Sequence, residues 1–169
     1  MILGIHWHPM PRTDLDQLPD DARIWIFGIS PALDDAQRAE ALATIDPFLD
    51  EWVAHNVPIT SARTIVQGSF LVVAVDQRSE TSGCSIDRMF GLLRQLEGRF
   101  GVQILEANRV FVRHGDGHVD AITRAEFRER GDLHTLVFDT LAERLGEIRS
   151  GSWEKHAEES WHRQLLKAG

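Results

Sequence analysis

The sequence predicts an α+β fold, in the form of a two-layer sandwich with a mostly antiparallel sheet and two main helices on one face. Several short runs are rich in β-branched and aromatic residues, and two longer segments carry apolar residues at helical spacing. Along the chain these elements follow the order strand, helix, strand, strand, helix, strand, strand. This order is typical of ferredoxin-like and related split βαβ arrangements, and we expect a C-terminal extension beyond it.

Length and composition favour one domain behind a short N-terminal arm. A chain of 169 residues with 43% hydrophobic and 26% charged residues is typical of a soluble globular protein with a sizeable core. Residues 1–21 are predicted to form an extended arm, because three prolines and four aspartates interrupt any regular element. Residues 22–169 are predicted to form a single α+β domain with a tryptophan-bearing C-terminal tail.

The first strand and the first helix follow the arm. Residues 22–29 are rich in β-branched and aromatic residues, which predicts a strand. Asp34 or Asp35 is a suitable N-cap for a helix whose apolar residues recur at helical spacing. Pro47 lies inside this pattern, so we expect the helix to be kinked or broken there and to end near 55–56.

A hairpin and a second helix come next. Strands are predicted at 59–66 and 70–75, joined by a glycine-containing turn at 67–69. The second of these strands is apolar on both faces, which predicts a central position in the sheet. The second helix presents one apolar face and stops around residues 98–101; the residues on that face are Ile86, Met89, Phe90, Leu93, Leu96 and Phe100.

The remaining predicted elements are shorter. They are a strand at 102–105, a hairpin made of 109–114 and 118–123 around a turn at 115–117, and a helix at 125–130. Trp153 and Trp161 stand in a polar tail, and each offers a large apolar area to bury. We therefore expect this tail to dock against the domain.

Charge and motif content exclude several classes of function. The 26 acidic and 18 basic residues give a net charge of −8, which argues against a nucleic-acid-binding surface, since phosphate neutralisation needs clustered Lys and Arg. One cysteine excludes an intramolecular disulfide and any Cys-x-x-Cys site. The chain has no phosphate-binding loop, dinucleotide fingerprint, nucleophile elbow or His-Glu-x-x-His motif. We therefore predict no cofactor and exclude ATP hydrolysis by a P-loop mechanism.

The sequence also predicts where the protein is found. No window approaches the roughly 18 consecutive apolar residues that a membrane helix needs. The N-terminus has neither the basic region nor the long apolar region of a signal peptide. A cytoplasmic location without a membrane partner is expected.

The predicted topology places a functional site at one rim of the sheet. If the elements alternate in direction across a single sheet, four parts of the chain share that rim. They are the end of the first helix, the end of the central strand, the start of the second helix and the tip of the last hairpin. The candidate residues gathered there are His55, Asp76, Cys84, Asp87, His114, Asp116 and His118.

Cys84 is the candidate nucleophile at this rim. In the first turn of a helix, unpaired backbone N–H groups and the helix dipole favour the thiolate over the thiol. His55 or a hairpin histidine would serve as the base, with Asp76 or Asp116 orienting the imidazole. The alternative is that Cys84 packs under the helix start, since free cysteine is among the most buried residue types.

The same helix start offers a ligand site without covalent chemistry. Hydroxyl and backbone N–H groups at a helix N-terminus can hold an anion or a phosphate. The alternative is that these polar residues only cap the helix. The residues assigned to this ligand-binding site are Ser82, Gly83, Ser85, Asp87, His114 and His118.

Two groups of histidines have the spacing of metal ligands. His6 and His8 would share one face of a strand, and His114, Asp116 and His118 surround a predicted turn. Asp-Gly is first of all a turn signal, and histidines beside it are ordinarily exposed. No metal site is therefore predicted.

Several motifs together resemble a family of small uncharacterised bacterial proteins that often carry the label "ABC transporter ATPase". The likeness runs from about Trp25 to His162, and the Ser-Gly-Cys-Ser-Ile-Asp stretch is its most specific part. Since the chain has no phosphate-binding loop, the resemblance implies no ATPase activity, and it supplies no catalytic residues. The motifs are Phe48-x-x-x-Trp52-x-x-His55-x-x-Pro58, Ala74-Val75-Asp76, Ser82-Gly83-Cys84-Ser85-Ile86-Asp87, and Trp153 with Ser160-Trp161-His162.

Two classes of function follow from these observations. A non-enzymatic module would bind a small molecule or another protein, including its own copy, through a sheet edge or the tryptophan tail. A thiol-dependent enzyme would act on a small substrate, with Cys84 as nucleophile and the N–H groups of Ser85 and Ile86 as oxyanion donors. The sequence shows no convincing catalytic triad, which favours the binding module.

Overall fold

The computed structural model describes residues 12–54, 57–76 and 83–167. Within these residues the chain forms a three-stranded sheet of order β1-β5-β4, a four-stranded sheet of order β7-β6-β8-β9 and a small β2-β3 pair. Every strand pairing is antiparallel. The α+β class predicted from the sequence is confirmed.

The first sheet contains β1 (Arg23–Gly28), β5 (Phe70–Val75) and β4 (Ser61–Val66). All six residues of β5 are buried, and this strand lies between the other two, as its continuous apolar sequence predicts. The turn between β4 and β5 places Gln67 and Gly68 in the left-handed region, at φ values of 54° and 70°. The predicted hairpin is thus confirmed.

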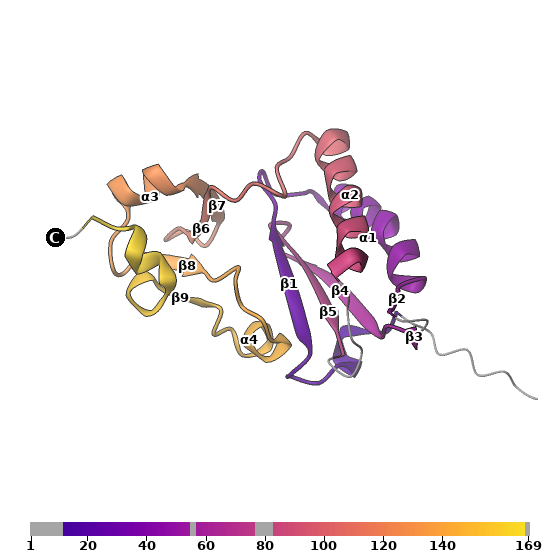
Figure 1. The fold of residues 1–169 in the computed structure, drawn as a ribbon. Coiled ribbons are helices and arrows are strands. Elements are labelled where there is room, and N and C mark those ends of the chain that lie inside the picture. The colour runs from indigo at the N-terminus through magenta and orange to yellow at the C-terminus, as the bar shows by residue number, and fades with distance from the viewer. Residues whose placement is uncertain (1–11, 55–56, 77–82, 168–169) are drawn as a thin grey trace, which may run out of the picture.

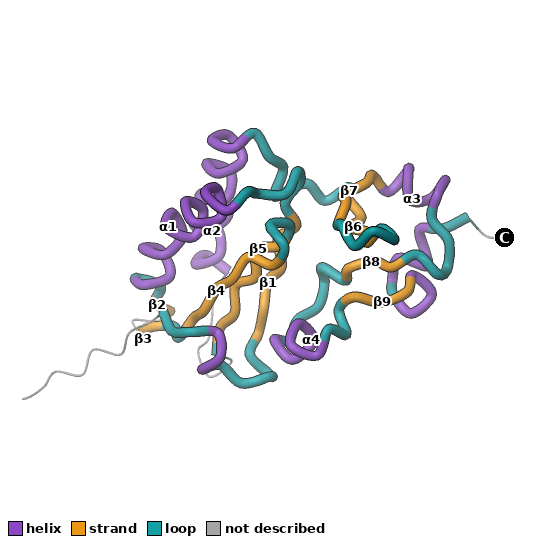
Figure 2. Tube along the Cα trace, turned by 180° about the vertical axis from the view of Figure 1, so that it is seen from behind, coloured by secondary structure: helices purple, strands orange, loops and turns teal. Residues whose placement is uncertain are grey.

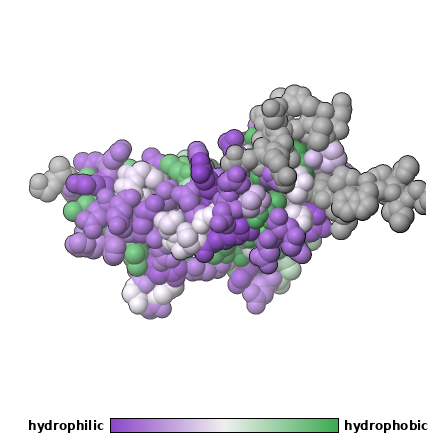
Figure 3. All heavy atoms as spheres, turned by 90° about the horizontal axis from the view of Figure 1, so that it is seen from below, coloured by the Kyte–Doolittle hydropathy of each residue, from purple (hydrophilic) through white to green (hydrophobic). Residues whose placement is uncertain are grey.

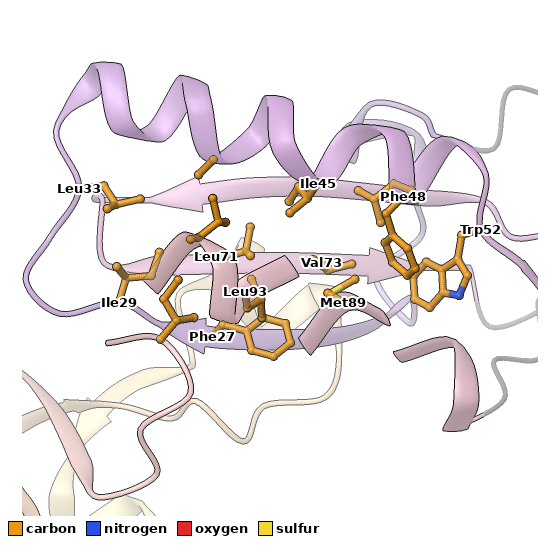
Figure 4. Close-up of a cluster of buried hydrophobic side chains, with 14 of the residues drawn as sticks. Phe27, Ile29, Leu33, Ile45, Phe48, Trp52, Leu71, Val73, Met89 and Leu93 are labelled. Carbon is orange, nitrogen blue, oxygen red and sulfur yellow. The ribbon is translucent and has the colours of Figure 1, made fainter. Parts of the chain in front are cut away.

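Two helices cover one face of this sheet, and Figures 1 and 2 show them lying side by side on it. The first, α1 (Asp35–Asp50), begins with a capping box in which Asp34 and Gln37 each accept the other's backbone N–H. The second, α2 (Gly83–Phe100), is the second helix that the sequence predicts. Figure 4 shows side chains from both helices and from β1 and β5 meeting in one cluster, among them Phe27, Ile45, Phe48, Leu71, Val73, Met89 and Leu93.

Helix α1 differs from its prediction at its C-terminal end. It is not broken at Pro47, and it ends at Asp50 rather than near residues 55–56, which lie outside the described residues. Pro47 removes one N–H donor from the helix, but the next two residues, Phe48 and Leu49, are buried against the sheet. Their packing holds the last turn in place.

The other face of the first sheet is buried as well. Phe70, Val72 and Ala74 of β5 belong to a second apolar cluster that includes Phe111 and Phe138 from the C-terminal half of the chain. The alternate residues of β5 face the helices. Both faces of β5 are therefore covered, each by a different part of the protein.

The second sheet contains β6 (Arg109–Arg113), β7 (Val119–Thr123), β8 (Leu136–Phe138) and β9 (Glu154–His156). The β6-β7 hairpin predicted from the sequence is confirmed. We expected this hairpin to extend the first sheet. That expectation is wrong, because β6 pairs with β8 instead.

A physical reason for this difference lies along β1. The backbone N–H of Ile24 donates to the carbonyl of Glu143, and the N–H of Leu145 donates to the carbonyl of Ala22. These bonds occupy the outer edge of β1 near its N-terminal end. A distant loop therefore covers the edge that the hairpin would have joined.

The C-terminal tail is packed, as predicted. Trp153 is 5% exposed and belongs to the same cluster as Phe70. The strand predicted at 102–105 is wrong, since this segment makes one isolated bridge, between Ser30 and Gln103. The remaining elements are β2 (Val53–Ala54), β3 (Val57–Pro58), α3 (Arg124–Arg130), α4 (Leu145–Ser150) and the 3-10 helices Leu15–Gln17, Ala157–Glu159 and Trp161–Leu165.

The surface is mainly polar on the face drawn in Figure 3, where hydrophobic residues appear in small separate areas among hydrophilic ones. None of the helices in the described part of the chain has both the length and the apolar character needed to cross a membrane.

Candidate functional site

The structure separates the predicted site residues into two groups. Asp76 follows the C-terminal end of β5. Phe70, at the opposite end of β5, packs against Phe111 of β6 with ring centroids 4.9 Å apart. The β6-β7 hairpin that carries residues 114–118 thus belongs to the second sheet and joins the opposite end of β5. The expectation that one rim collects the hairpin tip and Asp76 is wrong, because it assumed a single sheet.

The first group lies around the start of α2. Cys84 is in the first turn of this helix, as predicted, and Gly83 is its first residue. The side chains of Cys84 and Ser85 lie outside the described part of the structure, and so do residues 55 and 82. The catalytic dyad of Cys84 and His55 therefore stays a prediction. The anion site that includes Ser82 stays a prediction as well. Asp76 is 8% exposed and its backbone N–H donates to the carbonyl of Thr60. The side chain of Asp87 is exposed on α2.

The second group lies at the tip of the β6-β7 hairpin, and its members do come together. The imidazole rings of His114 and His118 are stacked with centroids 4.3 Å apart. Asp116 accepts the backbone N–H of His118 and also contacts its ring Nδ1. These hydrogen bonds, the backbone one first, lower the pKa of Asp116. All three side chains are exposed.

A cleft of about 280 Å³ lies at the junction of the two sheets, and its residues are not among those predicted from the sequence to form a site. Its walls come from β1, α2, β6, α3 and the segments 104–107 and 140–141. Aromatic rings supply much of the apolar wall, from Phe27, Phe90, Phe111 and Trp161. A junction between two packed units is a common place for small-molecule sites.

Two arginines bring positive charge to this cleft. One Nη of Arg109 donates to Gln103 Oε1 at 2.7 Å, while its Nε is buried with no hydrogen-bond partner. The guanidinium of Arg124 lies 5.5 Å from the ring centroid of Trp161. Among the described residues, neither arginine has a carboxylate within ion-pair distance. The acidic residue in the lining is Glu106, whose carboxylate accepts the backbone N–H of Asn108.

Arg109 has an electrostatic effect on the carboxylate of Glu126. Its pKa is lowered mainly by hydrogen bonds from Thr123, with smaller contributions from Arg130 and Arg109. Glu126 belongs to the capping box of α3, where its carboxylate accepts the N–H of Thr123. This carboxylate therefore serves the helix start and is not part of the cleft wall.

Trp161 is held in place from two sides. Its indole Nε1–H donates to Asp139 Oδ1 at 3.1 Å, and its ring stacks on His162 with centroids 3.9 Å apart. His162 is 1% exposed, and burial lowers its pKa to about 4, so its imidazole is neutral at pH 7. His162 Nδ1 lies 2.7 Å from Ser160 Oγ, within hydrogen-bond distance. The indole thus presents a fixed apolar surface to the cleft.

Gly28 is required where β1 passes β6. A Cβ atom at this position would lie 2.2 Å from Cε2 of Phe111, far inside van der Waals contact. The absence of a side chain lets the ring of Phe111 approach the strand. Gly28 and Phe111 both line the cleft, so this close approach shapes its floor.

Comparison with protein-family models found no match for this chain, and neither did comparison with curated proteins or with solved structures. The resemblance to the small bacterial family stays a prediction. What the structure defines is an α+β protein in which two antiparallel sheets meet beside an aromatic, arginine-lined cleft.

Proposed function

We propose that this protein is a binding module that holds a small anionic ligand with an apolar body in the cleft between its two sheets. The observation that carries this proposal is the pairing of two arginines, free of ion pairs among the described residues, with a wall of aromatic rings. Such a site attracts a negative group at one end of a ligand and removes the rest of that ligand from water.

The size of the cleft suits a small apolar body. Its volume of about 280 Å³ lies just below the range of about 300–1,000 Å³ for ligand pockets. Trp161 is fixed by Asp139 and His162, so little conformational entropy is lost when a ligand packs on its ring. These features support a ligand with one ring or two fused rings.

The charged end of the ligand would be recognised by Arg109. Its guanidinium lines the cleft and has no carboxylate partner among the described residues. A carboxylate or similar anion would supply that partner, and the planar guanidinium matches it. Since the whole chain carries a net charge of −8, positive charge in this cleft is a local feature and not a property of the whole surface.

The thiol-dependent alternative uses a different part of the molecule. Cys84 lies at the start of α2, and the segment before this helix follows the C-terminal end of β5. Gly28 in the cleft pairs with Phe70 at the opposite end of that strand. The two hypotheses can therefore be tested independently.

The test compares two ligands that differ in charge and hardly in shape, naphthalene-2-carboxylate and naphthalene-2-carboxamide. Titration calorimetry with the full chain is expected to show tighter binding of the carboxylate. Arg109→Gln is expected to weaken carboxylate binding tenfold or more, since a hydrogen bond to a charged group contributes about 1.5–3 kcal/mol, and to leave carboxamide binding nearly unchanged.

Arg94→Gln is the matched control. Arg94 is an exposed residue of α2 outside the cleft lining, so its replacement removes the same charge from the protein without touching the site. Equal binding of the two ligands, or an equal loss in both variants, would contradict the proposal.

A further inference from the structure

The tip of the β6-β7 hairpin carries a second set of ligand-type side chains, away from the cleft. His114, His118 and Asp120 each offer one ligand atom, and these three atoms lie within 4.8 Å of one another. We propose that the hairpin tip binds a divalent transition-metal ion of the zinc type through the imidazoles of His114 and His118 and the carboxylate of Asp120.

Strand geometry explains why these three side chains share one face. The backbone N–H of His114 donates to the carbonyl of His118, so the two residues lie opposite each other at the closed end of the hairpin. Opposite residues of an antiparallel pair point to the same face, and so do residues two apart on one strand. Asp120 follows His118 by two positions and pairs with Val112 in the register. The hairpin therefore presents the three groups together.

The donor set suits zinc. Zinc binds imidazole nitrogen and carboxylate oxygen at about 2.0–2.2 Å in a tetrahedral arrangement, which sets neighbouring ligand atoms roughly 3.3 Å apart. His114 Nε2 and Asp120 Oδ2 already lie 3.3 Å apart. The ligand atom of His118 lies within 4.8 Å of those of the other two residues, so a small adjustment of this exposed side chain brings it to the ion. Three protein ligands leave the fourth position for water.

Asp116 completes the site from the other side of His118. Its carboxylate contacts Nδ1 of that imidazole, which leaves Nε2 available for the ion. A carboxylate on the far nitrogen of a metal-bound histidine fixes the ring orientation and strengthens the ligand. Asp116 is thus a positioning residue and not a ligand.

A second exposed histidine pair in the protein lacks these features. His134 and His156 have ring centroids 6.1 Å apart, and His156 Nδ1 lies 2.7 Å from the carbonyl oxygen of His134. Within the part of the chain that the structure describes, this pair does not belong to a three-ligand group. It provides the matched control.

The experiment titrates ZnCl₂ into the metal-stripped full chain by calorimetry and records the visible spectrum with Co²⁺ in place of zinc. We expect one zinc ion per chain and the intense bands of four-coordinate Co²⁺. Both signals are expected to be lost in the His114→Asn/His118→Asn variant. Asp116→Asn is expected to weaken binding by about 10–100-fold. Far-UV circular dichroism verifies that each variant is folded.

Two control variants decide the assignment. His134→Asn/His156→Asn is expected to bind zinc like the wild type, and so is His6→Asn/His8→Asn, which removes the histidines of the N-terminal arm. The proposal is overturned if the hairpin variant still binds zinc, if either control variant loses it, or if the wild type does not bind zinc at micromolar concentration.

Discussion

The ring of Phe70 in β5 lies 4.9 Å from the ring of Phe111 in β6, measured between centroids, and this contact joins the two sheets. Phe138 and Trp153 each bring a ring to within 4.8 Å of Phe70 as well. Four aromatic residues from separate parts of the chain thus meet at one end of the central strand. The cleft lies beside this cluster, since Phe111 contributes to both.

Phe70→Ala is expected to lower the free energy of unfolding by about 3–5 kcal/mol, the usual cost of removing a buried aromatic ring. Phe70 is fully buried, and its loss leaves a cavity among three rings. Guanidinium unfolding followed by tryptophan fluorescence measures the change. The control is Phe100→Ala. Phe100 is only partly buried against the cluster between the helices and the first sheet, so its replacement is expected to lower the free energy of unfolding by less. A loss below about 1 kcal/mol in Phe70→Ala would contradict the joining of the sheets by this residue.

Gly28→Ala is expected to destabilise the protein by about 1–3 kcal/mol, because the new methyl group forces the buried ring of Phe111 to move. Gly91→Ala is the control. Gly91 lies within α2 with nothing within 4 Å of an added Cβ, so alanine is expected to raise stability by up to about 1 kcal/mol. Thermal unfolding of the two variants measures both changes, and a Gly28→Ala protein as stable as the wild type would show that the floor of the cleft is loosely packed.

Asp46→Asn is expected to cost about 1–2 kcal/mol, the range for a charged hydrogen bond that is partly screened by solvent. The carboxylate of Asp46 in α1 accepts two hydrogen bonds from Arg63 in β4, at 2.8 and 3.0 Å, and is 18% exposed. The control is Asp35→Asn, which removes a pair with Arg38 at a side chain that is 97% exposed. Its effect is expected to stay within about 0.5 kcal/mol. Equal effects in urea unfolding would show that the Asp46 pair contributes no more than a surface pair.

His162 is expected to make the protein less stable in mild acid. Burial lowers its pKa from 6.5 to about 4. Between these two values the unfolded chain binds a proton that the folded protein excludes, so the free energy of unfolding falls as the pH falls through this range. The expected contribution of His162 to the loss between pH 7 and pH 4.5 is about 2 kcal/mol, measured by urea unfolding at a series of pH values.

Two variants separate this contribution from that of other titrating groups. His162→Asn removes the buried imidazole. Between pH 7 and pH 4.5 this variant is expected to lose about 2 kcal/mol less stability than the wild type. His134→Asn removes an exposed imidazole and is expected to keep the pH dependence of the wild type. If wild type and His162→Asn lose stability in parallel, the folded protein accommodates the protonated form of His162.

Local patterns predicted most of the elements but not their assembly. The helical spacing of apolar residues in α2 and the continuous apolar run in β5 are each local patterns, formed by residues close together in the chain. Both patterns can therefore be recognised directly in the sequence. The choice of sheet for the β6-β7 hairpin depends instead on the bonds of Glu143 and Leu145 along β1. Those partners are more than 100 residues apart in the chain, and no local pattern relates them.

The candidate cleft escaped prediction for a similar reason. Its residues come from separate segments of the chain, and no pattern in the sequence shows that these segments meet. The two tryptophans of the polar tail were the available signal, since a large ring in such a segment indicates docking. At the hairpin tip, by contrast, the spacing of His114 and His118 around the turn was visible in the sequence, and the structure confirms that they meet.

The most direct test of ligand binding in the cleft is a ¹⁵N NMR titration of the full chain with naphthalene-2-carboxylate, in which the indole N–H signal of Trp161 is identified by its loss in Trp161→Phe. We expect the Trp161 and Gly28 signals to shift together with one dissociation constant, while the indole signal of Trp52, buried in the helix-covered core, stays in place. Saturable shifts elsewhere with an unchanged Trp161 signal would contradict the proposed site.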